Sequence, residues 1–345
     1  IRASLKPPIF PKLLLSSAYP LSKNSFLRLC ADAACNACGA TREAGLTYVE
    51  SIKFLQAPSL SFQDYIGIQV LIRNSVVKGY DKFYVEAVQV DPDGNVTTII
   101  LDPIAYSSSV SYFDHKVVSW SMAEQVTLTL YAEKEGKLFV GQSITTSVEQ
   151  LALEKLEGFG DTKPLNSTVL VDMLNYGAAV QTAFNHFADN LPNTNLGEYA
   201  KYATTTTPAM SAEPVITGSG TANPAKVSLS MQDKVELQFI YLKKTYGDLS
   251  NYTIKVTLNG VEQNYFVDTT SNASASVIRV AVGAANMRAT YVFELYDADG
   301  ALVSKTHNVC VEAYAKNQLG GTYNDVATTM MRYGDAITAF LADGK

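Results

Sequence analysis

The chain has little of several residue types, and each shortage narrows the classes of protein it can belong to. Its 345 residues include one Trp, three His and four Cys, and only 17% are charged. Three histidines leave few general bases for catalysis. No apolar run approaches the roughly 20 residues that a membrane-spanning helix needs, so we predict no membrane insertion. A formal net charge of −6, without a long Lys or Arg run, argues against nucleic acid as a partner.

The sequence also lacks the short motifs of common enzyme classes. It contains no His-Glu-x-x-His, no Gly-x-Ser-x-Gly, no phosphate-binding Gly loop and no dinucleotide fingerprint. Residues 91–95, Asp-Pro-Asp-Gly-Asn, have the acidity of a calcium loop but lack the rest of its ligand pattern. A hairpin turn is the better interpretation of this segment. We therefore predict no catalytic residues and no enzymatic activity.

What the chain does contain is a set of motifs that occurs twice in the same order. Residues 59–64, Ser-Leu-Ser-Phe-Gln-Asp, return as Ser-Leu-Ser-Met-Gln-Asp at 228–233. The other matches are Leu130-Tyr131 with Leu295-Tyr296, Val148-Glu149 with Val311-Glu312, and Tyr176-Gly177 with Tyr333-Gly334. The sequence therefore predicts two tandem copies of one unit. The repeated acids are interpreted as residues at the starts of strands (Asp64, Asp233) and helices (Glu149, Glu312), not as catalytic pairs.

Each copy is predicted to be mainly β. Apolar residues alternate along 66–72 and 235–241, which is typical of a strand with one buried face. Further strands are expected at 83–90, 96–101, 126–132 and 137–144, and at 252–259, 264–268, 276–282, 289–296 and 301–308. Polar-Gly pairs favour hairpin turns at 93–94, 135–136, 259–260 and 299–300. This pattern predicts an immunoglobulin-like β-sandwich.

A C-terminal amphipathic helix is expected to close each copy, which makes the chain α+β overall. Apolar residues recur at helical spacing from Leu170 to Phe187 and from Val326 to Phe340. The expected N-caps are Asn166, Ser167 or Thr168 in the first helix and Asn324 or Asp325 in the second. Gly177 and Gly334 share one mid-helix position, where Gly costs about 1 kcal/mol relative to Ala. Close backbone packing explains them best, and a partner-docking face is the alternative.

The composition predicts five segments along the chain. The connection between the two copies is rich in Thr, Gly and Pro, as flexible linkers are. The predicted segments are a disordered leader at 1–28, a Cys-rich motif at 29–45, a first module at 46–190, a linker at 191–226 and a second module at 227–345. Because the chain begins with Ile1, we expect it to be a fragment of a longer protein.

The Cys-rich motif holds Cys30, Cys35 and Cys38. A Cys-x2-Cys-Gly turn lets two thiolates reach one tetrahedral zinc ion, but a structural zinc site needs four ligands and no His lies nearby. Zinc binding by these three residues, a disulfide with one free thiol, and an incomplete module all remain open. Cys310 is placed in a predicted strand of the second copy and is interpreted as a buried apolar thiol. No other cofactor is predicted.

Taken together, these motifs resemble a known set of repeat modules. Cys-x4-Cys-Asn-x-Cys-Gly-x2-Arg, Ser-Leu-Ser-x-Gln-Asp, Leu-Tyr-x4-Gly and Tyr-Gly-x-Ala resemble modules of large secreted or wall-attached proteins of Firmicutes, chiefly gut clostridia. The resemblance covers roughly residues 30–345. It implies a bacterial cell-surface or secreted location and a modular role, but no activity. One departure is that such Cys motifs commonly carry a His before the first Cys, and here none does.

These observations predict a non-catalytic extracellular module for adhesion or ligand binding. Its partner would be a host protein or a glycan, and two copies would add avidity. The alternative is a carbohydrate-targeting or spacer region of a larger secreted glycan-degrading enzyme. Twenty Tyr residues suit both pleated surfaces and binding interfaces. Trp120 is interpreted as a half-buried strand residue, with a ligand platform as the alternative. An exposed aromatic row on one sheet face would favour sugar binding, and a flat, mixed polar face with an exposed strand edge would favour protein contact or plain spacing.

Overall fold

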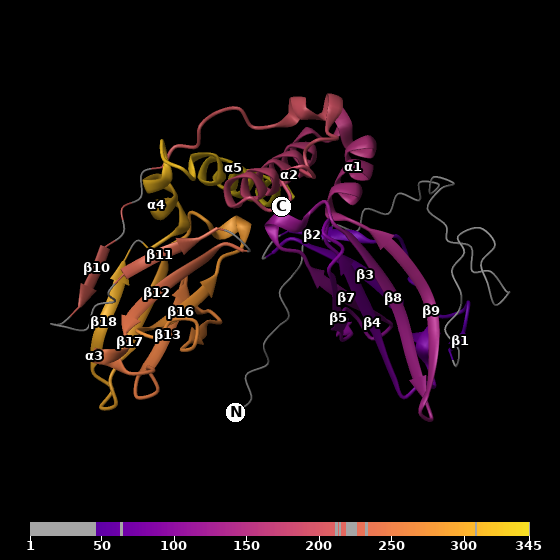
Figure 1. The fold of residues 1–345 in the computed structure, drawn as a ribbon, viewed down its shortest axis with the longest axis horizontal. Coiled ribbons are helices and arrows are strands. Elements are labelled where there is room, and N and C mark those ends of the chain that lie inside the picture. The colour runs from indigo at the N-terminus through magenta and orange to yellow at the C-terminus, as the bar shows by residue number, and fades with distance from the viewer. Residues whose placement is uncertain are drawn as a thin grey trace.

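The first half of the chain is built on two β-sheets. The computed structural model describes residues 46–62, 65–210, 213, 215–218, 226–231, 234–307 and 309–344. A five-stranded sheet has the order β1-β9-β8-β4-β5, and a four-stranded sheet has the order β2-β3-β7-β6 (Figure 1). The strands are β1 (Thr47–Tyr48), β2 (Ser59–Ser61), β3 (Gly67–Arg73), β4 (Lys82–Val90), β5 (Val96–Leu101), β6 (Ile104–Ala105), β7 (Val110–Lys116), β8 (Gln125–Lys134) and β9 (Lys137–Thr146).

The second half also contains a five-stranded and a four-stranded sheet. Their orders are β10-β18-β17-β13-β14 and β11-β12-β16-β15. The strands are β10 (Val215–Gly218), β11 (Lys226–Ser230), β12 (Glu236–Leu242), β13 (Thr253–Leu258), β14 (Val261–Glu262), β15 (Phe266–Asp268), β16 (Ala275–Ala281), β17 (Tyr291–Tyr296) and β18 (Leu302–His307). The outermost strands differ in direction, because β1 runs parallel to β9 whereas β10 runs antiparallel to β18.

The predicted alternation and turns explain most of these strands. Gly94, Gly136, Gly260 and Gly300 all have positive φ, at the hairpin positions that the sequence predicts. In each half the two sheets lie against each other, and their inward side chains form the core. Phe83 meets Phe113 edge to face at 6.2 Å, and Phe239 stacks on Phe293 at 4.4 Å. The prediction of a mainly β chain is therefore confirmed.

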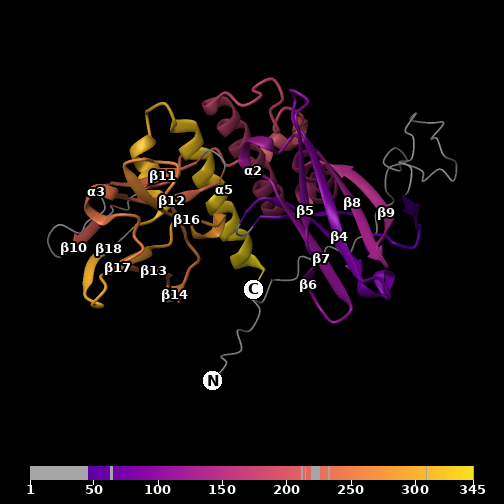
Figure 2. The same ribbon diagram turned by 60° about the horizontal axis from the view of Figure 1, so that its bottom comes forward.

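The three longest α-helices gather at one side of the two halves, whereas the four-residue helix Lys243–Tyr246 lies against β12 and β16 (Figure 1). The α-helices are α1 (Val148–Phe159), α2 (Pro164–Phe184), α3 (Lys243–Tyr246), α4 (Val311–Ala315) and α5 (Asn324–Asp343), and the short 3-10 helices are η1 (Asn74–Val77), η2 (Ser119–Ser121), η3 (Gly160–Thr162), η4 (Gly197–Tyr202), η5 (Ala284–Asn286) and η6 (Lys316–Gln318). Helices α2 and α5 lie side by side between the halves (Figure 2). In the part of the chain that is described, none of the helices has both the length and the apolar character that crossing a bilayer requires.

Gly177 and Gly334 let α2 and α5 closely approach the 3-10 helices η2 and η5. A Cβ atom at Gly177 would lie 2.8 Å from Met122 Sδ and 2.9 Å from the Ser119 carbonyl. At Gly334 it would lie 2.8 Å from Met287 Sδ and 3.0 Å from the Ala284 carbonyl. All four distances are shorter than an ordinary van der Waals contact, so a Cβ atom would not fit at either position. The interpretation of close backbone packing is therefore confirmed.

The helix starts differ from the prediction. Asn166, Ser167 and Thr168 lie inside α2, which begins at Pro164, because Pro is well suited to the first turn of a helix. Glu149 and Glu312 do stand at helix starts, each as the second residue of α1 and α4. The predicted strand starts Asp64 and Asp233 lie outside the described residues.

The connection predicted as a linker is packed against the helices over much of its described length. Leu196 is buried in the core, and η4 and β10 form within the segment. Arg332 on α5 donates hydrogen bonds to the carbonyls of Thr205 and Thr206 at 2.9 and 3.0 Å. Strand β10 then pairs with β18. Where it is described, the connection therefore packs against both halves, because η4 and Thr204 contact α2 whereas β10 pairs with β18.

Candidate functional site

The cysteines for which the sequence predicts zinc or a disulfide, Cys30, Cys35 and Cys38, lie outside the described residues. Cys310 immediately precedes α4 and does not lie in β18, although it is buried as expected, and burial raises the pKa of its thiol. Among the described residues no three His, Cys, Asp or Glu side chains come close enough together to hold a metal ion. The candidate site therefore has to be sought on the surfaces and among the buried polar groups of the sheets and helices.

The acidic segment 91–95 forms the hairpin turn that the sequence predicts. Asp91 accepts hydrogen bonds from the backbone N–H and the side-chain amide of Asn95, both at 2.8 Å. The side-chain bond from Asn95 is the main cause that lowers the pKa of Asp91. Gly94 supplies the positive φ that closes the turn. The carboxylate is therefore occupied in shaping the turn between β4 and β5.

Trp120 lies in the 3-10 helix η2, so its placement in a strand is wrong, although it is half-buried as expected. Its indole ring stacks on the imidazole of His186, with centroids 4.6 Å apart and an interplanar angle of 20°. Phe187 lies beside it at 6.4 Å. The ring thus packs the end of α2 onto η2, and one face of it is already covered.

The outer edge of the first five-stranded sheet carries apolar side chains in contact with solvent. Among the described residues, strand β5, Val-Thr-Thr-Ile-Ile-Leu, pairs on one side only, with β4, and its register there has no bulge. Natural edge strands usually carry Lys, Pro or a bulge that prevents pairing with another chain, and β5 has none of these. Val96 is 62% exposed and Ile100 is 49% exposed. We name the exposed residues here the β5 patch: Val90, Val96, Ile99, Ile100, Ile104 and Tyr106.

The backbone of β5 offers hydrogen-bonding groups along this edge. The Asp91 N–H donates to the Asn95 carbonyl at 3.1 Å, which makes this pair the first hydrogen-bonded pair of the ladder. Bonded and non-bonded pairs alternate along an antiparallel ladder. With the observed register, Thr97, Ile99 and Leu101 turn their backbone groups toward β4. Val96, Thr98 and Ile100 therefore turn their N–H and C=O groups toward the free edge.

The outward face of the same sheet is polar rather than lined with an aromatic row. Hydroxyl pairs cross the strands between Thr127 and Thr145 at 2.9 Å and between Thr129 and Ser143 at 2.8 Å. One aromatic pair, Tyr84 and Tyr131, stacks with ring centroids 5.4 Å apart. A mixed polar face that ends at an exposed strand edge favours protein contact or plain spacing over sugar binding.

Inside the first half, three polar side chains meet between the sheets. His115 on β7 is 1% exposed, and its Nε2 lies 3.3 Å from Gln89 Oε1 on β4. The amide of Gln89 donates to Glu124 Oε2 at 2.6 Å. Because the Gln89 oxygen can only accept, neutral His115 carries its proton on Nε2. Within the described chain, His115 Nδ1 and Glu124 Oε1 have no hydrogen-bond partner.

The burial of this trio shifts the pKa of both ionisable members toward their neutral forms. Burial raises the pKa of Glu124 to about 7, and the nearby Asp91 charge adds to the effect. Burial lowers the pKa of His115, against the opposing influence of Asp114. At neutral pH His115 is therefore uncharged while Glu124 is close to its midpoint. An acid and a base are present, but they are enclosed between the sheets, and each is bonded through Gln89.

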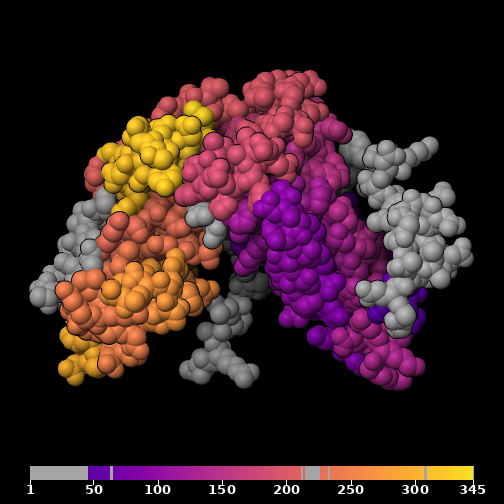
Figure 3. Space-filling view, viewed as in Figure 1, coloured from indigo at the N-terminus to yellow at the C-terminus, as the bar shows by residue number. Residues whose placement is uncertain are grey.

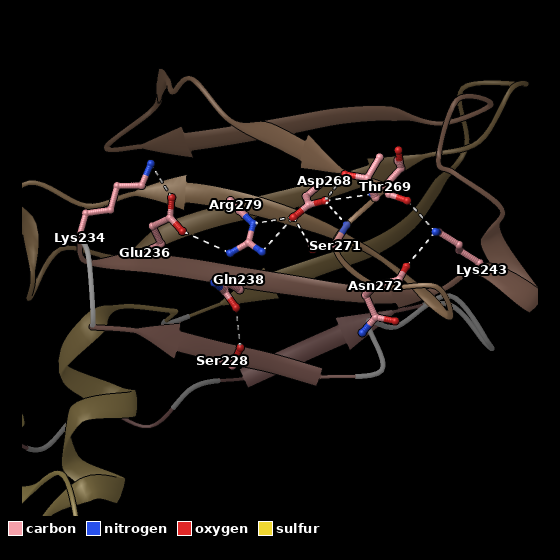
Figure 4. A network of polar contacts seen from close by, with 11 residues as sticks. Ser228, Lys234, Glu236, Gln238, Lys243, Asp268, Thr269, Ser271, Asn272 and Arg279 are labelled. Carbon is pink, nitrogen blue, oxygen red and sulfur yellow. Dashed lines mark hydrogen bonds and ion pairs between the residues drawn. The ribbon is translucent and has the colours of Figure 1, made fainter. Parts of the chain in front are cut away.

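A different polar network lies on the four-stranded sheet of the second half (Figure 4). Arg279 on β16 donates to Asp268 Oδ2 from Nε at 3.2 Å and from Nη2 at 3.0 Å. Its Nη1 lies 3.5 Å from Glu236, which also pairs with Lys234 at 2.9 Å. Hydrogen bonds, led by that from the Ser271 side chain, hold the pKa of Asp268 well below its usual range. Each charge is compensated, which indicates a structural role in the turn between β15 and β16.

A groove of about 580 Å³ lies between α2 and α5. Its polar lining includes Asp172, Asn175, Thr182, Asn193, Asn324 and Arg332. Asp172 is buried and accepts hydrogen bonds from Thr204 N at 3.0 Å and Thr204 Oγ1 at 2.6 Å. Burial raises the pKa of this carboxyl despite those bonds. Amides and hydroxyls of this kind suit a neutral polar ligand.

Sequence reasoning did not single out the β5 patch, although part of its signal was present. Residues 96–101 contain no charged residue, Pro or Gly, which is unusual for a strand that ends a sheet. No family model matches this chain, and the search of curated proteins finds no match either.

Proposed function

We propose that this chain is a non-catalytic binding module of a secreted or cell-surface bacterial protein, and that it binds a protein partner through the β5 patch. The observation that carries the proposal is the edge strand β5, which lacks Lys, Pro and a bulge and exposes Val96 and Ile100. Exposed backbone groups give affinity for an added strand, and the flanking side chains give specificity. The resemblance to modules of Firmicutes surface proteins suggests the same kind of role and location.

The two halves are proposed to be two copies of one immunoglobulin-like sandwich that carries closing helices. Three features support this: matching orders of the inner strands, a glycine at the same place in α2 and α5, and a Met contact beneath each glycine. The sequence repeats point the same way.

The junction between the halves supports a fixed two-module unit rather than a flexible tether. Tyr176 of α2 donates to the Met231 carbonyl of the second half at 3.3 Å. Tyr333 of α5 donates to the Phe62 carbonyl of the first half at 3.2 Å, and the two rings stack 6.2 Å apart. Below these helices the two halves diverge (Figure 3). Avidity would then come from two surfaces held at a fixed spacing. Only a partner whose two sites match that spacing would bind both surfaces at once and gain affinity.

A binding screen of the whole chain against extracellular proteins and glycans tests this function. The double variant Val96→Lys/Ile100→Lys places charge on the patch without entering the core. The matched control is Val261→Lys, which changes a residue 64% exposed at the corresponding edge of the second half. We expect saturable binding to a protein that the double variant loses and the control keeps. Saturable binding that both variants keep would overturn the assignment to the β5 patch. A folded chain that binds none of these partners and does not self-associate would favour the spacer role.

The groove between α2 and α5 favours a second candidate, carbohydrate targeting. Its amide and hydroxyl lining, with Arg332 and Asp172 at its sides, suits the hydroxyls of a sugar. In the same screen, glycan binding that Asn175→Ala weakens and Val96→Lys/Ile100→Lys leaves unchanged would support this candidate instead.

A further inference from the structure

We propose that the partner strand of β5 is β5 of a second molecule of this chain, so that two five-stranded sheets join across a two-fold axis. This inference rests on the proposed function, because it names the partner of the β5 patch. The inference is based on three features of β5. Its free backbone groups and its exposed side chains can each pair with those of a second β5, and the strand carries no charge that would repel the second copy.

The backbone argument concerns register. Val96, Thr98 and Ile100 direct their N–H and C=O groups toward the free edge. An antiparallel pairing centred on Thr98 places Thr98 opposite Thr98 of the second molecule, and Val96 opposite Ile100. Every residue with free groups then faces another such residue, and each pair exchanges both backbone hydrogen bonds. Residues 96–100 of the two β5 strands pair with each other, and no outward-facing backbone group of β5 is left without a partner.

The side-chain argument concerns what this register brings together. Val96 and Ile100, both largely exposed in one molecule, would cover each other on the outer face. Two Thr98 hydroxyls would meet at the centre, and Thr–Thr and β-branched pairs are favourable across strands. The strand has no charged side chain, so the two-fold axis creates no like-charge contact within it. Like charges approach only at the rim, where Asp102 of one molecule would lie beside the turn that holds Asp93 of the other.

The second half explains why this pairing is assigned to β5. The corresponding edge strand β14 has only two residues, Val261 and Glu262. A short strand that carries a carboxylate is the usual protection against edge-to-edge pairing. A two-fold pairing of β14 would also place the two Glu262 charges close together. The chain therefore protects one of its two corresponding edges and leaves the other open.

Sedimentation equilibrium of the full chain tests the inference directly. We expect reversible dimers whose dissociation constant rises at least tenfold in Val96→Lys/Ile100→Lys and stays within about twofold in Val261→Lys. A chain that stays monomeric at all accessible concentrations would overturn the inference, as would dimers that the double variant leaves intact. If the chain is monomeric yet an extracellular protein binds at the β5 patch, the proposed function stands and only the second molecule is excluded.

A cross-linking measurement tests the register. Opposed residues of a hydrogen-bonded pair have Cα atoms about 5.5 Å apart, within the range that a disulfide bridges. Thr98→Cys should therefore form an intermolecular disulfide under mild oxidation, at a higher yield than the wild-type chain. Thr145→Cys, exposed on the same face but away from the edge, is the matched control. Equal yields from the two variants would overturn the pairing at Thr98. Amide exchange provides an independent reading, because Thr98 N–H should become protected as the concentration rises.

Discussion

The two halves of the chain arrange their inner strands in the same order, yet they fill three corresponding positions differently. In the first half these positions form a buried polar trio, and in the second half they are apolar. The residues are Gln89, His115 and Glu124 in one half, and Leu258, Val280 and Ala289 in the other. The comparison shows that the fold does not need the trio.

The correspondence follows from the strand registers. Gln89 pairs with Val126 on β8 as Leu258 pairs with Tyr291 on β17. His115 pairs with Ile68 as Val280 pairs with Leu237. Glu124 lies two residues after Met122, and Ala289 lies two residues after Met287. Because apolar residues are accommodated at the same places, the polar trio has a cost that the second half avoids.

The corresponding edge strands of the two halves, β5 and β14, also differ, but here the first half is the more apolar one. Strand β5 is long, uncharged and exposed, whereas β14 is two residues long and includes Glu262. The first half therefore differs from the second half both in its core and at this edge. These are the positions at which a role specific to the first half is to be sought.

Removing the charge of Glu124 gives the largest expected effect. Its pKa is about 7 in the folded chain, above the ordinary value of 4.5, so the folded chain retains a proton that the unfolded chain has released. The free energy of unfolding should therefore fall by about 2–3 kcal/mol as pH rises from 4.5 through 7. Glu124→Gln should lose this slope and be more stable than the wild type at pH 8. Chemical denaturation of both proteins at several pH values measures this pH dependence of the unfolding free energy.

The exposed Glu157→Gln is the matched control, and it should retain the wild-type slope. The lowered pKa of His115 acts in the opposite sense, since stability is lost as pH falls below about 6.5. If Glu124→Gln keeps the full loss of stability between pH 5 and 8, the titration of the buried Glu124 carboxyl is not the cause of that loss.

The two helix glycines test a feature that the halves share. In Gly177→Ala and Gly334→Ala the new Cβ meets a backbone carbonyl, and this overpacking outweighs the gain in helix propensity. We expect each variant to lose about 1–2 kcal/mol of unfolding free energy. Gly158→Ala in α1 is the control, because nothing lies within 4 Å of its Cβ position, and it should be neutral or stabilising. A loss in only one half would mean that the two helices do not pack equivalently.

The reciprocal tyrosines test the junction. Tyr176→Phe and Tyr333→Phe each remove one hydrogen bond to a carbonyl of the other half, and each should cost about 1 kcal/mol. Tyr106→Phe, on an exposed side chain, should change stability by less than about 0.5 kcal/mol. Thermal unfolding reports the differences. Two separate transitions in either variant would show that the junction couples the halves, and unchanged stability would show that these bonds contribute nothing.

Most of the sheet framework could be predicted from the sequence, and the omissions have physical causes. Strand β7 was missed because two of its inward residues, Ser111 and His115, are polar and break the apolar alternation. The start of α1 was predicted at Glu149, and its Ser147 cap accepts from Gln150 N at 3.0 Å, but the extent of the helix to Phe159 was not predicted. The β5 patch could not be found from the pattern, since which strand ends a sheet depends on long-range pairing.

The smallest expected effect concerns the acidic residues at the ends of the proposed β5 pairing and the salt dependence that they give the dimer. In the register centred on Thr98, Asp102 of one molecule approaches Asp93 of the other, and both are exposed. Exposed like charges repel weakly and are screened by salt. Raising the salt concentration from about 50 to 500 mM should therefore strengthen the dimer by about two- to fivefold. Asp102→Asn should weaken this dependence, whereas Asp299→Asn, at a hairpin turn of the second half, should leave it unchanged. Sedimentation at several salt concentrations separates the two variants. A dimer that salt weakens would indicate attractive ion pairs at the interface, and β5, which has no charged residue, cannot supply them.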